Sequence, residues 1–80
     1  MKVLLAEDEK RMNRALCEIM RQEGYEVTSV DNGKDALYEI ESNIYDLCVL
    51  DVMMPGLSGY DVAKKSTGIR YTHADTYAYC

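Results

Sequence analysis

The sequence predicts an α/β protein with a parallel sheet, and two features of its hydrophobic pattern support this class. Residues 47–50 form an uninterrupted apolar run, LCVL, which is typical of a strand covered on both faces. Short apolar stretches also alternate along the chain with segments whose apolar residues recur at helical spacing. Strands and helices that alternate with short links predict βαβ units, with right-handed crossovers that place helices on both faces.

The first predicted strand and helix occupy residues 2–23. The apolar stretch from Lys2 to Ala6 forms the strand, and the acidic cluster at positions 7–9 ends it. Apolar residues recur at helical spacing between positions 10 and 23: Met12, Ala15, Leu16, Ile19 and Met20. Gly24 stands where a C′ glycine would end this helix.

Two further strand and helix pairs follow. Residues 25–30, YEVTSV, read as the second strand, and the turn at 31–33, DNG, also offers a helix cap. Apolar residues at 36, 37 and 40 predict a helix to about Ser42. The apolar run then ends at Asp51, and residues 59–65 begin a third helix.

Residues 66–80, STGIRYTHADTYAYC, differ from the rest of the chain. They contain no Leu, Val, Met or Glu, and they hold the only histidine. Two interpretations stay open: an extended, weakly alternating segment, or a foreign or out-of-frame sequence joined to an interrupted domain. We therefore divide the chain into residues 1–65 and a tail of residues 66–80. No second ligand of usual spacing lies near His73, so we expect an incidental exposed histidine.

Length, charge and cysteine usage exclude several classes of protein. Eighty residues make one small domain, and a net charge of −5 argues against nucleic acid as a partner. No apolar run approaches the roughly 20 residues of a membrane span, and the N-terminus turns acidic too early for a signal peptide. Three widely spaced cysteines without a CxxC indicate neither a zinc site nor a disulfide framework. We expect a cytoplasmic protein.

Carboxylates stand at the ends of two predicted strands. Glu7 and Asp8 follow the first strand, and Asp51 ends the third. If those strands are neighbours, three acids converge, which is costly unless a cation joins them or some stay protonated. Oxygen ligands of this kind suit Mg²⁺, and a carboxylate beside such an ion can attack a phosphoryl group. A calcium site, a structural cluster and a turn cap at Asp51 are the alternatives. Glu9 and Asp46 are expected at the surface.

Three motifs give the sequence a family resemblance. LLAEDE, DNGKDAL and DLCVLDVMMPGLSGYDV closely resemble the receiver domain of bacterial two-component response regulators. The likeness covers residues 2 to about 65, the first three of that family's five β/α units. It implies a flavodoxin-like (CheY-like) parallel sheet of strand order 2-1-3-4-5, truncated to about three units, which a tail strand or dimerisation would complete. Strands 1 and 3 are then neighbours at the topological switch point, where ligands are expected.

The resemblance also implies roles for individual residues. Asp51 accepts a phosphoryl group from a sensor histidine kinase, in a signalling domain rather than an enzyme. Glu7, Asp8, Asp51 and the backbone carbonyl of Met53 bind Mg²⁺, with Mn²⁺ as a substitute. One of Met53 and Met54 is expected to be buried. Pro55, and the glycines at 56 and 59, suit tight backbone geometry beside this site.

The chain departs from the family pattern at important positions. Many receivers carry Asp where this chain has Glu7, and nothing after Lys65 matches the family's Ser or Thr of strand 4 or its Lys of strand 5. We therefore expect a truncated receiver that is phosphorylated slowly and switches poorly. One alternative is an inactive, self-associating fragment. A less favoured one is a phosphatase of the haloacid dehalogenase type, whose DxDx[TV] motif needs a second acid that is missing after Asp51.

Self-association is the last expectation from the sequence. Without strands 4 and 5, the third strand would lie at an edge of the sheet with unpaired backbone groups. Helix faces that should pack on the missing strands would also be bare. These features predict a homodimer. The tail from Ile69 to Tyr79 has strand-like composition, and it could pair with the third strand of its own chain or of a partner.

Overall fold

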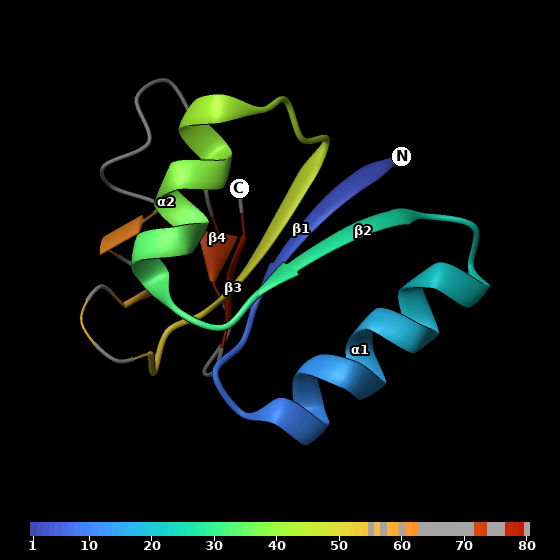
Figure 1. The fold of residues 1–80 in the computed structure, drawn as a ribbon, viewed down its shortest axis with the longest axis horizontal. Helices are drawn as coiled ribbons and strands as arrows, with labels where there is room; N and C mark the ends of the chain where they lie inside the picture. Colours follow the sequence, from blue (N-terminus) through green and yellow to red (C-terminus); the bar gives the residue numbers. More distant parts are fainter. Residues whose placement is uncertain (55, 57, 60, 63–71, 74–76, 80) are drawn as a thin grey trace.

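Strands and helices alternate through the first 51 residues of the computed structural model (Figure 1). The structure describes residues 1–54, 56, 58, 59, 61, 62, 72, 73 and 77–79. Its elements are β1 (Lys2–Ala6), α1 (Lys10–Gln22), β2 (Glu26–Val30), α2 (Gly33–Ser42), β3 (Leu47–Asp51), β4 (Thr72–His73) and β5 (Tyr77–Tyr79). Residues 59, 61 and 62 are helical, where the third helix was expected to begin. The predicted α/β class and order of elements are confirmed.

Helix α1 begins and ends, and helix α2 begins, at residues whose chemistry suits those positions. Glu9 caps α1, because its carboxylate accepts hydrogen bonds of 3.2 and 2.8 Å from two backbone N–H groups of the first turn. Gly24 follows the C-terminal end of α1 with φ of +91°, a conformation that favours glycine. Asn32 caps α2 by accepting a hydrogen bond of 2.8 Å from the N–H of Asp35. The caps expected at Gly24 and at the 31–33 turn are thus confirmed.

Three parallel strands form the part of the sheet that matters for the site. β1 lies in the middle, paired with β2 on one side and with β3 on the other. The register places Ala6 beside both Val30 and Leu50. α1 and α2 lie on opposite faces of this sheet (Figure 1), as right-handed crossovers in opposite directions require. This is the 2-1-3 portion of a flavodoxin-like sheet.

The C-terminal strands extend the sheet in the opposite direction. β5 pairs with β3 in an antiparallel register that sets Tyr77 opposite Asp51 and Tyr79 opposite Val49. β4 pairs antiparallel with β5, with His73 opposite Ala78. Only three residues separate β4 from β5, which suits a hairpin, whereas a parallel crossover needs a dozen or more. The chain's own tail therefore covers the edge of β3, and the strands beyond β3 depart from an all-parallel order.

The main hydrophobic core lies between the sheet and α2. Leu4, Ala6 and Leu50 are fully buried there, together with Ala36 of α2. Val62 joins them from the helical segment that begins at position 59. Half of the cluster comes from alternate positions of β1 and β3, since successive side chains of a strand point to opposite faces.

The two methionines after β3 have opposite environments. Met54 is 7% exposed and belongs to the core, whereas Met53 is 77% exposed. The expectation that one of them is buried is confirmed.

Helix α1 leaves part of its apolar surface uncovered. Cys17 is buried, but Met12 and Ile19 are 46% and 57% exposed. Cys17 and Cys48 are buried cysteines that form no disulfide with each other, and Cys80 lies outside the described residues. Within the described part of the chain, no helix has the length and apolarity needed to cross a membrane.

Candidate functional site

The acidic residues at positions 7, 8 and 51 meet at one edge of the sheet because of the strand register. Ala6 of β1 lies beside Leu50 of β3, so Glu7 and Asp51 are the next residues on two neighbouring parallel strands. Asp8 follows Glu7 in the turn that leads to α1. The carboxyl ends of parallel strands are where α/β sheets bind ligands.

The three carboxylates form a compact and partly buried cluster. One oxygen from each of Glu7, Asp8 and Asp51 lies within 4.8 Å of the other two. Glu7 and Asp51 are only 4% and 5% exposed, whereas Asp8 is exposed. The cluster is therefore reached from solvent on the side of Asp8, and hard oxygen donors of this kind suit Mg²⁺ or Mn²⁺.

Asp51 is held in place by its neighbours and has a perturbed acidity. The backbone N–H of Met53 donates a hydrogen bond of 2.9 Å to Asp51 Oδ1. Burial, followed by hydrogen bonding with Glu7, raises the pKa of Asp51 above its usual range, although Met53 and Asp8 oppose this shift. A buried carboxyl beside a second carboxyl holds a proton more readily, and a cation between them would favour the ionised form.

The helical segment that begins at Gly59 packs directly on the end of β3. Ser58 and Asp61 form a capping box, since each side chain accepts a hydrogen bond of 3.2 Å from the other residue's backbone N–H. A Cβ built on Gly59 would lie 2.6 Å from the backbone oxygen of Asp51 and 2.8 Å from that of Leu50. Only glycine permits this approach. Pro55 lies outside the described residues.

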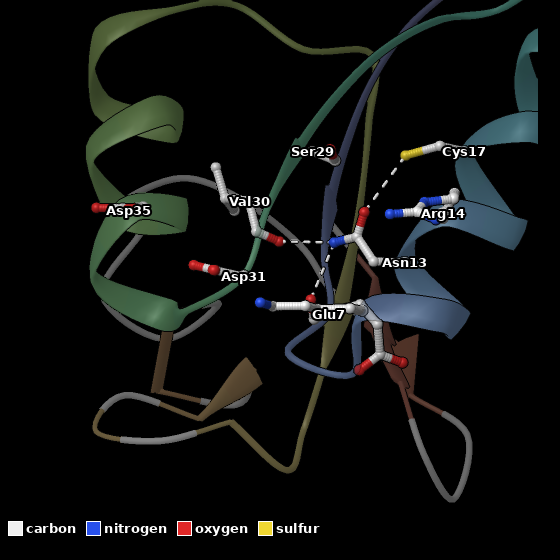
Figure 2. Close-up of a pocket in the computed structure, with 9 residues that line it drawn as sticks. Glu7, Asn13, Arg14, Cys17, Ser29, Val30, Asp31 and Asp35 are labelled. Carbon is white, nitrogen blue, oxygen red and sulfur yellow. Dashed lines mark hydrogen bonds between the residues drawn. The ribbon is translucent and has the colours of Figure 1, made fainter.

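Asn13 of α1 contacts the site, although it was not among the residues expected there. Its Nδ2 donates hydrogen bonds of 2.9 Å to the backbone oxygen of Glu7 and 3.0 Å to that of Val30, as Figure 2 shows. The sequence contained a signal: Asn13 lies one helical turn before Leu16 and Cys17, among the apolar positions of this helix. A polar residue on an inward face must find hydrogen-bond partners.

An open cleft of about 500 Å³ adjoins the cluster between α1, the end of β2 and the start of α2 (Figure 2). Its lining combines acidic, basic and polar residues: Glu7, Lys10, Asn13, Arg14, Cys17, Ser29, Val30, Asp31 and Asp35. Glu7 belongs to both the cleft and the acidic cluster, so the two features are continuous.

The structure thus brings together the three acids predicted from the sequence. Met53 lies two residues beyond Asp51 and contacts it through its N–H group. Glu9 caps α1 and is exposed, as expected. Asp46 lies at the far end of β3, where it accepts a hydrogen bond of 2.7 Å from the backbone N–H of Lys2. Within the described residues, the cluster of possible metal ligands consists of Glu7, Asp8 and Asp51 alone.

Comparison with known proteins agrees with this geometry. The family model of the response regulator receiver domain matches residues 3–73. This chain belongs to that family. Receiver domains are signalling domains of two-component systems, so the resemblance seen in the three motifs, the flavodoxin-like fold and the assignment to response regulators are confirmed.

Individual relatives support the same assignment. The sensory transduction protein RegX3 of Mycolicibacterium smegmatis is 44% identical over 63 residues, which cover 79% of this chain and 28% of RegX3. The response regulator TrrA of Thermotoga maritima, solved in complex with Mg²⁺-BeF, is 41% identical with a TM-score of 0.78. That match covers 80% of this chain and 56% of TrrA.

A further solved structure contains a kinase. The complex of the histidine kinase ThkA with TrrA matches at 36% identity and a TM-score of 0.76, covering 92% of this chain and 72% of the matched chain. The chain thus spans about a quarter of the length of RegX3 and about half of the length of TrrA in its Mg²⁺-BeF complex.

Proposed function

We propose that this receiver domain accepts a phosphoryl group on Asp51 from a sensor histidine kinase. The observation that carries the proposal is the cluster of Glu7, Asp8 and Asp51, whose oxygens lie within 4.8 Å at the ends of two neighbouring strands. Asp51 is the nucleophile that the family resemblance implies, and it ends β3 with its side chain held by the Met53 N–H. A carboxylate oxygen attacks phosphorus, and the bond from phosphorus to the donor's leaving group breaks.

The donor set fits Mg²⁺, with Mn²⁺ as a substitute. Glu7, Asp8 and Asp51 offer carboxylate oxygens, and the backbone carbonyl of Met53 is the further ligand that the family resemblance implies. When bound, the cation neutralises the oxygens of the phosphoryl group. The Met53 N–H holds one oxygen of Asp51 and so orients the carboxylate. The Mg²⁺-BeF complex of TrrA supports this assignment by similarity.

The kinase partner and a slow reaction form part of the same proposal. The structure of ThkA with TrrA supports a histidine kinase as the donor. We expect slow phosphorylation and weak switching of residues 1–80, because residues 66–80 contain no lysine and none of them matches the hydroxyl residue that the family places beside the site. Loss of preorganised electrostatic contacts commonly costs about 10²–10³-fold in rate.

The homodimer, the lack of nucleic-acid binding and a cytoplasmic location remain predictions. The bare edge of β3 that motivated the dimer is covered by β5 of the same chain. With that edge covered, the feature that favours self-association is the exposed apolar surface of α1, which includes Met12 and Ile19.

Intact-mass measurement after incubation with acetyl phosphate and Mg²⁺ tests the proposal. We expect the chain to gain one phosphoryl group slowly, the Asp51→Asn variant to gain none, and EDTA to abolish the reaction. The control is Asp46→Asn, which removes an acid at the opposite end of β3 and should leave labelling intact. Equal labelling of wild type and Asp51→Asn would refute Asp51 as the acceptor. No labelling of the wild type would favour the inactive fragment.

A further inference from the structure

Asn13 ties the peptide group between Glu7 and Asp8 to the end of β2. Its Nδ2 donates to the backbone oxygen of Glu7 at 2.9 Å and to that of Val30 at 3.0 Å (Figure 2). The Glu7 oxygen belongs to the planar peptide group whose nitrogen belongs to Asp8. This hydrogen bond therefore fixes the orientation of the peptide group that joins Glu7 to Asp8. The orientation of that group sets the directions in which the two acidic side chains leave the backbone.

Neighbouring hydrogen bonds define how the amide is oriented. The carbonyl oxygens of Glu7 and Val30 are acceptors only, so Nδ2 must face them. On the other side, the Sγ of Cys17 donates to Asn13 Oδ1 at 3.6 Å. The Val30 oxygen also accepts a hydrogen bond of 3.1 Å from the N–H of Glu7. Residue 7 is thus held through both its N–H and its carbonyl.

The carboxylate of Glu7 is in turn held within the same turn of chain. The N–H of Glu9 donates to Glu7 Oε2 at 3.3 Å, and Glu9 itself caps α1. Asn13 lies in the first half of that helix, so a rigid element carries the amide that holds the acidic turn. Asn13 links the turn to β2, since its Nδ2 donates to the backbone oxygens of both Glu7 and Val30.

We propose that Asn13 is a positioning residue for the cation site formed by Glu7, Asp8 and Asp51. This inference rests on the proposed function. Asn13 does not contact the cation or the phosphoryl group, and it acts through the Glu7–Asp8 peptide. Loss of the amide frees that peptide to rotate, which spreads the oxygens that now lie within 4.8 Å. Groups that orient metal ligands commonly contribute about 10–100-fold to affinity.

Titration of the full chain with Mn²⁺ tests the proposal. We expect Asn13→Ala to bind Mn²⁺ about tenfold more weakly than the wild type. The matched control is Asn43→Ala, which removes an amide that donates to Glu39 at the C-terminal end of α2 and should leave the affinity unchanged. In Asn13→Asp a carboxylate faces two carbonyl oxygens and cannot donate to them. Its added negative charge would by itself tighten cation binding, so weaker binding would identify the lost hydrogen bonds as the cause.

A spectroscopic measurement separates positioning from a loss of stability. In the absence of metal, Asn13→Ala should shift the carbonyl ¹³C of Glu7 and the amide ¹⁵N of Asp8, because both belong to the peptide group that loses its hydrogen bond. General destabilisation would not select these two nuclei. The isosteric Asn13→Asp variant decides the matter if Asn13→Ala does not fold.

The outcomes distinguish this proposal from the one on which it rests. Equal Mn²⁺ affinity in the wild type and Asn13→Ala, or unchanged Glu7 and Asp8 resonances in Asn13→Asp, would overturn the role of Asn13 and leave the acidic site intact. A wild-type chain without Mn²⁺ affinity would overturn the site itself, and the role of Asn13 with it.

Discussion

Replacement of Gly59 by alanine should strain the strand end that carries Asp51. The added Cβ would lie 2.6 Å from the Asp51 oxygen, whereas ordinary contacts begin at 3.4 Å, so the two groups must separate by 0.8 Å. The obstructing atoms are backbone, which moves only with the end of β3 or the start of the helical segment. Overpacking of this kind typically costs about 1–3 kcal/mol. We expect Gly59→Ala to lower the free energy of unfolding by about 2 kcal/mol.

Thermal unfolding followed by circular dichroism measures this effect. A loss of about 2 kcal/mol corresponds to a fall in Tm of roughly 8–16 °C for a domain of this size. The sign is diagnostic, because glycine is helical at this position and alanine has the higher helix propensity by about 1 kcal/mol. In the absence of a clash, the substitution would stabilise the chain.

Gly24→Ala provides the control for Gly59→Ala. Gly24 has φ of +91°, and a Cβ added there would have no other atom within 4 Å, so alanine meets backbone strain without a clash. We expect a loss of about 1 kcal/mol and unchanged Mn²⁺ affinity. A Gly59→Ala variant that unfolds at or above the wild-type temperature would refute the close packing of residue 59 on β3.

Three further predictions concern the acids and the tail. Because burial raises the pKa of Asp51 in the folded chain, ionisation of Asp51 at pH 7 lowers the free energy of unfolding. This loss of stability disappears as the pH falls through the folded pKa toward the ordinary value of 3.8. Asp51→Asn should therefore stabilise the chain at pH 7 in urea unfolding, and the gain should shrink toward pH 4. A gain that grows on acidification would contradict this sign. Asp8→Asn should weaken Mn²⁺ binding in a calorimetric titration, and equal affinity would remove Asp8 from the site. A chain ending at Lys65 lacks β5 and exposes the edge of β3, so sedimentation should show more association than for the full chain. A monomeric shortened chain would show that this edge does not drive assembly.

The first 51 residues were predictable because local signals and tertiary packing agree there. The apolar run at 47–50 is buried or half-buried as a strand, and Gly24 ends its helix in the expected conformation. The convergence of Glu7 and Asp51 followed once β1 and β3 were taken as neighbours, since both residues come directly after paired positions. That β1 and β3 are neighbours was inferred from the family resemblance, because local sequence patterns do not determine the order of strands in a sheet.

Other features depend on contacts that no local pattern reveals. The tail's composition allowed a strand, but pairing with its own chain in an antiparallel register depends on how β4 and β5 reach the edge of β3. The role of Asn13 depends on two carbonyl oxygens from different strands meeting beside α1. Gly59 was expected to permit tight geometry, but the atoms that require glycine are known only from the packed structure.

The antiparallel pairing of β5 with β3 has a mechanical consequence. β1 begins and β5 ends on the same side of the sheet (Figure 1), opposite the acidic edge where Asp51 faces Tyr77. A force applied between the two ends of the chain therefore pulls across the strands rather than along them. It opens the β3–β5 ladder from Tyr79 toward Tyr77, one residue pair after another, instead of shearing all the pairs at once. In an optical trap the tail should detach at low force, before the three parallel strands separate.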